Sequence, residues 1–144
     1  MKRVKWYLVL LLVGIFLFVG CSSEGPTPPP VVNIPIEQFQ VQPHIDVVMY
    51  CAVGRELTVT LGSNPTTGYQ WTEEAVIRDD DIIEQTSHKF VGPGIDEPPG
   101  TSGEDVWVFK GLKRGTTTIL LIYSRSWEEA GIGFWTVDIT ATVK

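Results

Sequence analysis

The chain has 144 residues with 17 Asp and Glu against 11 Lys and Arg, which gives a formal net charge of −6 at pH 7. This length allows one globular domain with additional segments. The negative charge repels phosphate backbones and therefore argues against a nucleic-acid partner.

The first 20 residues have the composition of a secretory signal. Basic residues at positions 2, 3 and 5 precede an uncharged apolar run that ends at Val19. The same run is long enough to span a bilayer, so an uncleaved helical anchor is the alternative. The ending Phe18-Val19-Gly20-Cys21 resembles a bacterial-type lipobox, although Phe18 stands where that pattern usually has Leu. We expect lipidation of Cys21 and an exported lipoprotein anchored on a periplasmic or extracellular membrane face.

Lipidation of Cys21 would leave Cys51 as the only thiol, so no internal disulfide is expected. Cys51 lies in an apolar run, and we interpret it as a small buried hydrophobe rather than a nucleophile. Removal of the signal leaves 8 basic against 17 acidic residues, a net charge near −9. The polar, proline-rich residues 22–30 predict an extended spacer. The expected organisation is a signal peptide at 1–20, a lipidated tether and lead-in at 21–44, and a domain at 45–144.

The predicted domain consists of strands. Leu57, Val59 and Leu61 alternate with threonines, and a second alternation runs from Trp135 to Val143. A period of two is typical of strands with one buried and one solvent-facing side. Residues 106–109 and 119–123 are apolar on both faces and suit central strands, whereas residues 82–91 give a weaker strand. With no convincing amphipathic helix, the pattern predicts an all-β, immunoglobulin-like antiparallel sandwich of about seven to eight strands.

The reactive side chains give no sign of catalysis. His44 and His88 belong to no nucleophile or zinc-protease motif, and we interpret both as solvated surface residues. Asp79-Asp80-Asp81 lacks the spacing of a calcium loop and reads as a solvated charge run. No glycine-rich phosphate loop lies between a strand and a helix. We therefore expect no enzyme, no cofactor and no metal site.

The stretch GSNPTTGYQW, residues 62–71, is longer than a simple hairpin connection needs. Pro65 fixes its own φ and restrains Asn64, whose side chain can hydrogen-bond to the backbone two residues on. The two threonines that follow are stiff at χ1, and Gly68 permits a positive φ. Tyr69 and Trp71 share one strand face and could fasten the base of the loop. We expect a short, rigid, neutral projection; the alternative is a well-made turn with no contact role.

Two further loops have more elaborate chemistry than a connection requires. Pro98 to Gly103 precedes a strong strand, and its glycines leave the backbone bare, although a merely flexible loop looks the same. Arg125 and Trp127 stand at the end of the most apolar strand and share a face if that strand continues. Arg and Trp are enriched among interface hot spots. The alternative is a Trp packed on its own sandwich beside a solvated Arg.

Together, in order and separation, the three segments resemble the motifs of the chagasin family of cysteine-peptidase inhibitors, N-P-T-T-G-[YF], G-x-x-G and R-P-W. The resemblance covers about Val47 to Lys144. Ser126 stands in place of the family's proline, which bears on affinity more than on the mode of binding. The matching residues are Asn64, Pro65, Thr66, Thr67, Gly68 and Tyr69, then Gly100, Thr101, Ser102 and Gly103, then Arg125 and Trp127.

The resemblance implies reversible, competitive inhibition of papain-like cysteine peptidases by three loops that occlude the active-site cleft. The first loop would enter the cleft over the catalytic cysteine with Thr66 and Thr67 at its tip, and the other two would grip the sides. Two other classes stay open. One is an immunoglobulin-like surface lipoprotein that binds another protein without inhibiting a peptidase. The other is a lipoprotein hydrolase, which would need His44 and His88.

Overall fold

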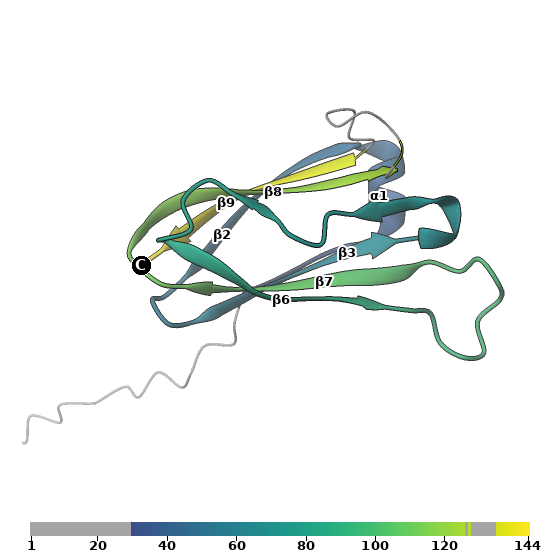
Figure 1. Ribbon diagram of the computed structural model, residues 1–144, viewed down its shortest axis with the longest axis horizontal. Helices are drawn as coiled ribbons and strands as arrows, with labels where there is room; N and C mark the ends of the chain where they lie inside the picture. The colour runs from purple at the N-terminus through teal and green to yellow at the C-terminus, as the bar shows by residue number, and fades with distance from the viewer. Residues whose placement is uncertain (1–29, 126, 128–134) are drawn as a thin grey trace, which may run out of the picture.

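The computed structural model describes residues 30–125, 127 and 135–144, which form a sandwich of two β-sheets (Figure 1). One sheet has the strand order β1-β3-β7-β6 and the other β2-β9-β8-β4, with the short β5 paired to β8. The bounds of the first sheet are β1 Val31–Ile34, β3 Glu56–Ser63, β7 Gly103–Gly111 and β6 Ile83–Val91. Those of the second are β2 His44–Cys51, β9 Trp135–Val143, β8 Gly115–Arg125, β4 Tyr69–Trp71 and β5 Val76–Ile77. The expected all-β sandwich is confirmed.

The core lies between the sheets and is built by the alternation seen in the sequence. Leu57, Val59 and Leu61 of β3 are fully buried, and the inward residues of β9 are buried from Trp135 to Val143. The doubly apolar segments form β7 and β8, each of which has strand neighbours on both sides. Their outward-facing apolar residues, Val106, Val108, Leu120 and Ile122, are half-buried. Residues 83–91 form one continuous strand, β6, with a register shift between Gln85 and Ser87.

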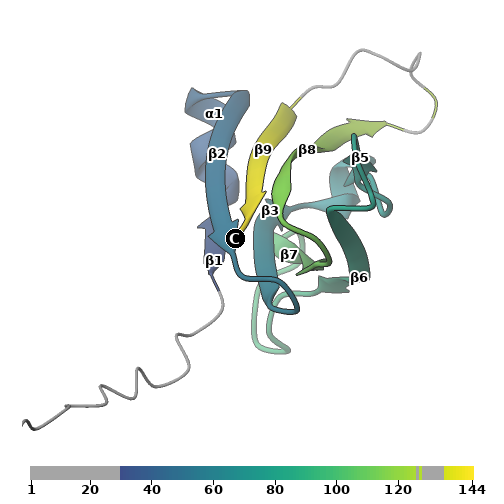
Figure 2. The ribbon, with the colours of Figure 1, turned by 90° about the vertical axis from the view of Figure 1, so that its left-hand side faces the viewer.

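The folded part begins before residue 45, where the sequence predicts the domain boundary. β1 pairs with β3, and the helix α1, Ile36–Val41, follows it and leads into β2 (Figure 2). Phe39 of α1 is fully buried against the rings of Trp71 and Trp135, with ring centroids 5.1 and 5.2 Å away. The lead-in therefore contributes a strand, a helix and a core aromatic to the sandwich.

The edges of the sandwich differ from a purely antiparallel arrangement. β1 runs parallel to β3, and β2 runs parallel to β9. Both parallel pairs follow from α1, because this helix carries the chain from the first sheet to the second at one end of the sandwich. The remaining pairs are antiparallel, as expected.

The two ends of the sandwich carry different connections. At one end, which we call the loop end, lie the turn after β3, the β6–β7 connection, the end of β8 and the helix α1 (Figure 1). Pro30 and Lys144, the first and last described residues, lie at the opposite end, where the amide of Thr58 donates to the Pro30 carbonyl and that of Lys144 to Cys51. Both ends of the described chain are thus remote from the loops.

Cys51 is buried beside this opposite end and forms no disulfide. Burial raises the pKa of its thiol, because the thiolate loses its hydration there. The interpretation of Cys51 as a small buried hydrophobe is confirmed. Among the described residues, no helix is long and apolar enough to cross a bilayer. The signal segment 1–20, Cys21 and Ser126 lie outside the described residues.

Candidate functional site

The first loop is held by hydrogen bonds that its own residues make. After β3 the chain forms a single 3₁₀ turn, η1, at Pro65–Thr67. The Thr67 hydroxyl and amide both donate to the Asn64 carbonyl, at 2.7 and 3.1 Å. The Thr66 hydroxyl donates to the Asn64 side-chain oxygen at 2.5 Å. Both threonine side chains are exposed, so the tip presents methyl groups and hydroxyls on a backbone fixed from within.

Gly68 closes this turn in the left-handed conformation, with φ of +82°. Its amide donates to the Pro65 carbonyl at 3.0 Å. A Cβ added to Gly68 would lie 2.7 Å from Cη2 of Trp127. Two features therefore require glycine at position 68, namely the positive φ and the indole ring of Trp127 that lies against it.

Two aromatic residues fasten the base of the loop, as their spacing predicts. Tyr69 stacks on Tyr123 with ring centroids 5.5 Å apart, and the indole nitrogen of buried Trp71 donates to the Gly62 carbonyl at 3.0 Å. The Asn64 amide donates to the Tyr123 hydroxyl at 3.1 Å. These contacts tie both ends of the turn to the core and leave only its tip exposed.

The second loop is joined directly to the first. The side-chain amide of Asn64 donates to the Gly100 carbonyl at 3.0 Å, a contact between residues 36 positions apart. The Asn64 side chain therefore hydrogen-bonds to the Thr66 hydroxyl and the Gly100 carbonyl. The sequence predicts a different partner, the backbone two residues on. Gly100 has φ of +88°, and Thr101 donates through its hydroxyl to the Pro98 carbonyl at 2.8 Å. Gly103 begins β7 so close to its neighbour that a Cβ would lie 2.4 Å from the Val91 carbonyl oxygen.

The third segment lies on the other side of the first loop. Arg125, the last residue of β8, pairs in register with Tyr69, and its guanidinium lies 4.2 Å from the centre of the Tyr69 ring. The same guanidinium lies 5.7 Å from the ring centre of Trp127, whose side chain is 70% exposed. Arg125 thus links the base of the first loop to an aromatic surface, an arrangement that fixes a normally flexible side chain.

The structure therefore brings the three segments together at the loop end. Between them lies a groove of about 470 Å³, which we call the edge groove. It is lined by Ile36, Glu37, Gln40, Asn64, Thr67, Tyr69, Ser102, Tyr123, Arg125 and Trp135. Members of all three segments share this groove, and two of its residues, Glu37 and Gln40, project from a helix that the sequence does not predict.

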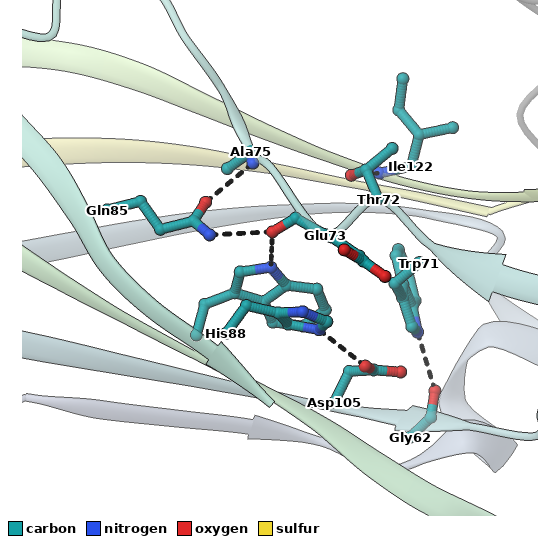
Figure 3. Close-up of polar contacts among 10 residues, drawn as sticks. Gly62, Trp71, Thr72, Glu73, Ala75, Gln85, His88, Asp105 and Ile122 are labelled. Atoms are coloured by element: carbon teal, nitrogen blue, oxygen red, sulfur yellow. Dashed lines mark hydrogen bonds and ion pairs between the residues drawn. The ribbon is translucent and has the colours of Figure 1, made fainter. Parts of the chain in front are cut away.

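Behind the first loop, a polar network joins the strands that support it (Figure 3). The Trp107 indole and the Gln85 side-chain amide both donate to the Glu73 carbonyl, at 3.2 and 2.8 Å. Gln85 also accepts from the Ala75 amide at 2.8 Å. These bonds hold the segment after β4 against β6 and β7, so the exit of the first loop is fixed as well as its entry.

His88 departs from its expected role as a solvated surface residue. Its Nε2 lies 2.7 Å from an oxygen of Asp105, and its ring stacks on Trp107 with centroids 4.7 Å apart. Cross-strand pairing of β6 with β7 creates this environment, which single-residue properties do not reveal. His44 is exposed as expected, and its Nδ1 lies 2.9 Å from the Thr136 hydroxyl.

The described residues contain no group of three or more metal-ligating side chains close enough to hold an ion. In the Asp79–Asp81 run, the Asp81 amide donates to the Asp79 carboxylate at 3.2 Å, which is a local turn contact. His44 and His88 lie in different sheets. The geometry at the loop end suits binding through a rigid, exposed edge.

Comparison with solved structures places this architecture among known inhibitors. A cysteine protease inhibitor from Entamoeba histolytica is 24% identical, with a TM-score of 0.58 over 82% of this chain and all of that one. An inhibitor from Leishmania mexicana is 30% identical, with a TM-score of 0.52 over 72% of this chain and 92% of that one. PbICP-C, solved in complex with falcipain-2, is 19% identical, with a TM-score of 0.55 over 81% of this chain and 96% of that one. No curated protein is similar enough to be matched.

At the level of sequence families, residues 50–141 match the model of the chagasin family of peptidase inhibitors, I42. This range contains the first loop, the second loop and Arg125 with Trp127, and it excludes β1 and α1. The three motifs, the sandwich and the family match agree, and the chain belongs to the chagasin family of peptidase inhibitors.

Proposed function

We propose that this domain inhibits papain-like cysteine peptidases reversibly and competitively by inserting its loop end into the active-site cleft. The observation that carries the proposal is the rigid edge made by the three segments, joined through Asn64 and Arg125. Family membership supports peptidase inhibition, and the related PbICP-C was solved with falcipain-2.

The first loop acts as the occluding element. Its tip carries Thr66 and Thr67, which are exposed and whose hydroxyls are held by hydrogen bonds to Asn64. A rigid loop loses little conformational entropy on docking, so its contact energy is retained as affinity. Neither threonine is a catalytic group, and the proposed action is obstruction of the cleft without reaction.

The other two segments hold the cleft from its sides. In the second loop Gly100 is exposed and Thr101 and Ser102 are half-buried, so this segment can offer peptide hydrogen-bonding groups to the partner before the chain enters β7 at buried Gly103. Arg125 and exposed Trp127 supply a flat cationic and aromatic surface of the kind enriched in hot spots. In this proposal the protein is an inhibitor and not an enzyme. Its inhibitory residues are those of the three motifs.

We also propose that the inhibitor is exported and anchored as a lipoprotein through Cys21. The basic and apolar signal with its lipobox-like ending supports this, and the proline-rich segment 22–30 would hold the domain away from the membrane. Such an anchor would place the inhibitor where exported or foreign peptidases are encountered.

Steady-state inhibition of papain by residues 31–144 tests the proposal. We expect competitive inhibition, with Thr67→Asp and Trp127→Ala each raising the inhibition constant at least tenfold, because the first places a charge at the tip and the second removes an anchor. Thr116→Asp is the matched control, since Thr116 is exposed on β8 far from the loop end. All variants should keep the wild-type circular dichroism spectrum.

Two results would contradict the proposal. The absence of inhibition of papain and of cathepsins at micromolar concentration would remove the function itself. Unchanged inhibition by both Thr67→Asp and Trp127→Ala would keep the function but refute the assignment of the loops.

A further inference from the structure

The helix α1 extends the loop end by a fourth element that lies outside the family match. It lies beside the three segments because the chain crosses there from β1 to β2 (Figures 1 and 2). Its position is fixed by core contacts. Phe39 is fully buried between Trp71 and Trp135, and the Ile36 backbone approaches Gly62 so closely that a Cβ there would lie 2.3 Å from the Ile36 nitrogen.

This anchoring makes α1 a rigid neighbour of the first loop. Trp71 connects the two directly, because its ring packs on Phe39 while its indole nitrogen holds the Gly62 carbonyl just before the loop. A six-residue helix is only marginally stable alone, so its order here comes from tertiary packing. Its outward side chains are therefore presented at fixed positions relative to Asn64 and Thr67.

Two of those side chains, Glu37 and Gln40, are exposed and line the edge groove together with Asn64, Thr67 and Arg125. A partner that covers the first loop and Arg125 therefore meets the α1 wall of the same groove. No described residue forms an ion pair or hydrogen bond with the Glu37 carboxylate, which leaves it available to a partner. The groove thus has a cationic wall at Arg125 and an anionic wall at Glu37.

We propose that α1 is a fourth contact element of the inhibitor, in which Glu37 pairs with a basic side chain on the rim of the bound peptidase and Gln40 hydrogen-bonds beside it. This inference rests on the proposed function, since it concerns the same loop end. A carboxylate suits a Lys or Arg partner because opposite charges steer association and are favourable at an interface rim. The excess of acidic residues in the chain favours the same kind of partner.

Association and dissociation rates with papain, measured over a range of salt concentrations, test this inference. We expect Glu37→Lys to raise the inhibition constant about threefold to tenfold at low salt, mainly through slower association, and this difference to shrink as salt screens the charges. Gln40→Ala should raise it about twofold to threefold through faster dissociation.

Matched controls separate a local contact from a change in net charge. Glu56→Lys makes the same charge change at an exposed position at the opposite end of β3, and Gln38→Ala truncates an exposed α1 residue that does not line the edge groove. Both should leave the inhibition constant within about twofold of wild type at every salt concentration. Thermal unfolding of each variant verifies that α1 remains packed.

The outcomes distinguish this inference from the function on which it rests. Equal effects of Glu37→Lys and Glu56→Lys, or tighter inhibition by Glu37→Lys, would overturn the assignment of α1 while wild-type inhibition stood. A wild-type domain that inhibits no papain-like enzyme would instead overturn the proposed function and this inference with it.

Discussion

Substituting Gly68 by Ala tests whether the contact between the first loop and Trp127 matters for inhibition. Gly68 has φ of +82°, and an added Cβ would lie 2.7 Å from Cη2 of Trp127. The left-handed backbone costs a non-glycine residue about 1 kcal/mol or slightly more, which corresponds to a fall in melting temperature on the order of 4 °C for a domain of this size. The methyl group must in addition displace the indole ring.

Gly54→Ala provides the matched control. Gly54 has a similar φ of +78°, lies at the end opposite the loops, and has no atom within 4 Å of an added Cβ. Both variants should therefore lose about the same 1 kcal/mol of unfolding free energy from backbone strain. Only Gly68→Ala should also weaken inhibition, because displacement of Trp127 removes a hot-spot contact.

Loss of such a contact costs about 2 kcal/mol or more, which predicts a rise of at least tenfold in the inhibition constant. The assay is steady-state inhibition of papain, paired with urea unfolding of the same preparations. Equal inhibition constants for Gly68→Ala and Gly54→Ala would refute the reasoning, since the packing of Trp127 on the loop would then contribute nothing to binding.

Two further substitutions test the N-terminal part of the chain. Phe39→Ala should lower the unfolding free energy by about 3–5 kcal/mol, because it empties a fully buried aromatic site between Trp71 and Trp135; urea unfolding measures this, and a loss below about 1 kcal/mol would show that α1 does not belong to the core. Cys21→Ser should abolish labelling of the full-length chain by a radioactive fatty acid in bacterial cells and release the protein from the membrane fraction. Retention of the label and of membrane association would rule out Cys21 as the lipidation site.

The strands could be predicted because their pattern is local. The alternation of Leu57, Val59 and Leu61 with threonines predicts that the three apolar residues share one buried face, and all three are fully buried in β3. The threonine face is covered as well, since Thr58 is half-buried and Thr60 is buried. The rigidity of the first loop could also be predicted from the sequence. Proline fixes its own φ wherever it occurs, as Pro65 does here, and glycine permits the positive φ that Gly68 adopts.

What could not be predicted depends on contacts between distant residues. The six-residue α1 buries only Phe39, so it leaves no helical periodicity to detect. The hydrogen bond from Asn64 to Gly100 and the pairing of His88 with Asp105 arise only when separate strands and loops meet. The sequence indicates which segments have unusual chemistry, whereas the way these segments support one another appears only in three dimensions.

The placement of both described chain ends opposite the loop end has a practical consequence for this inhibitor. Pro30 and Lys144 lie at the far end of the sandwich, so a sensor surface, a reporter domain or a second inhibitor unit joined there leaves the inhibitory edge free. Two copies linked through the ends opposite their loops could bind two peptidases at once. On a clustered target, such a dimer would bind more tightly than one copy because of avidity. In the lipoprotein that we propose, the segment from Cys21 would join the sandwich at the end remote from the inhibitory edge.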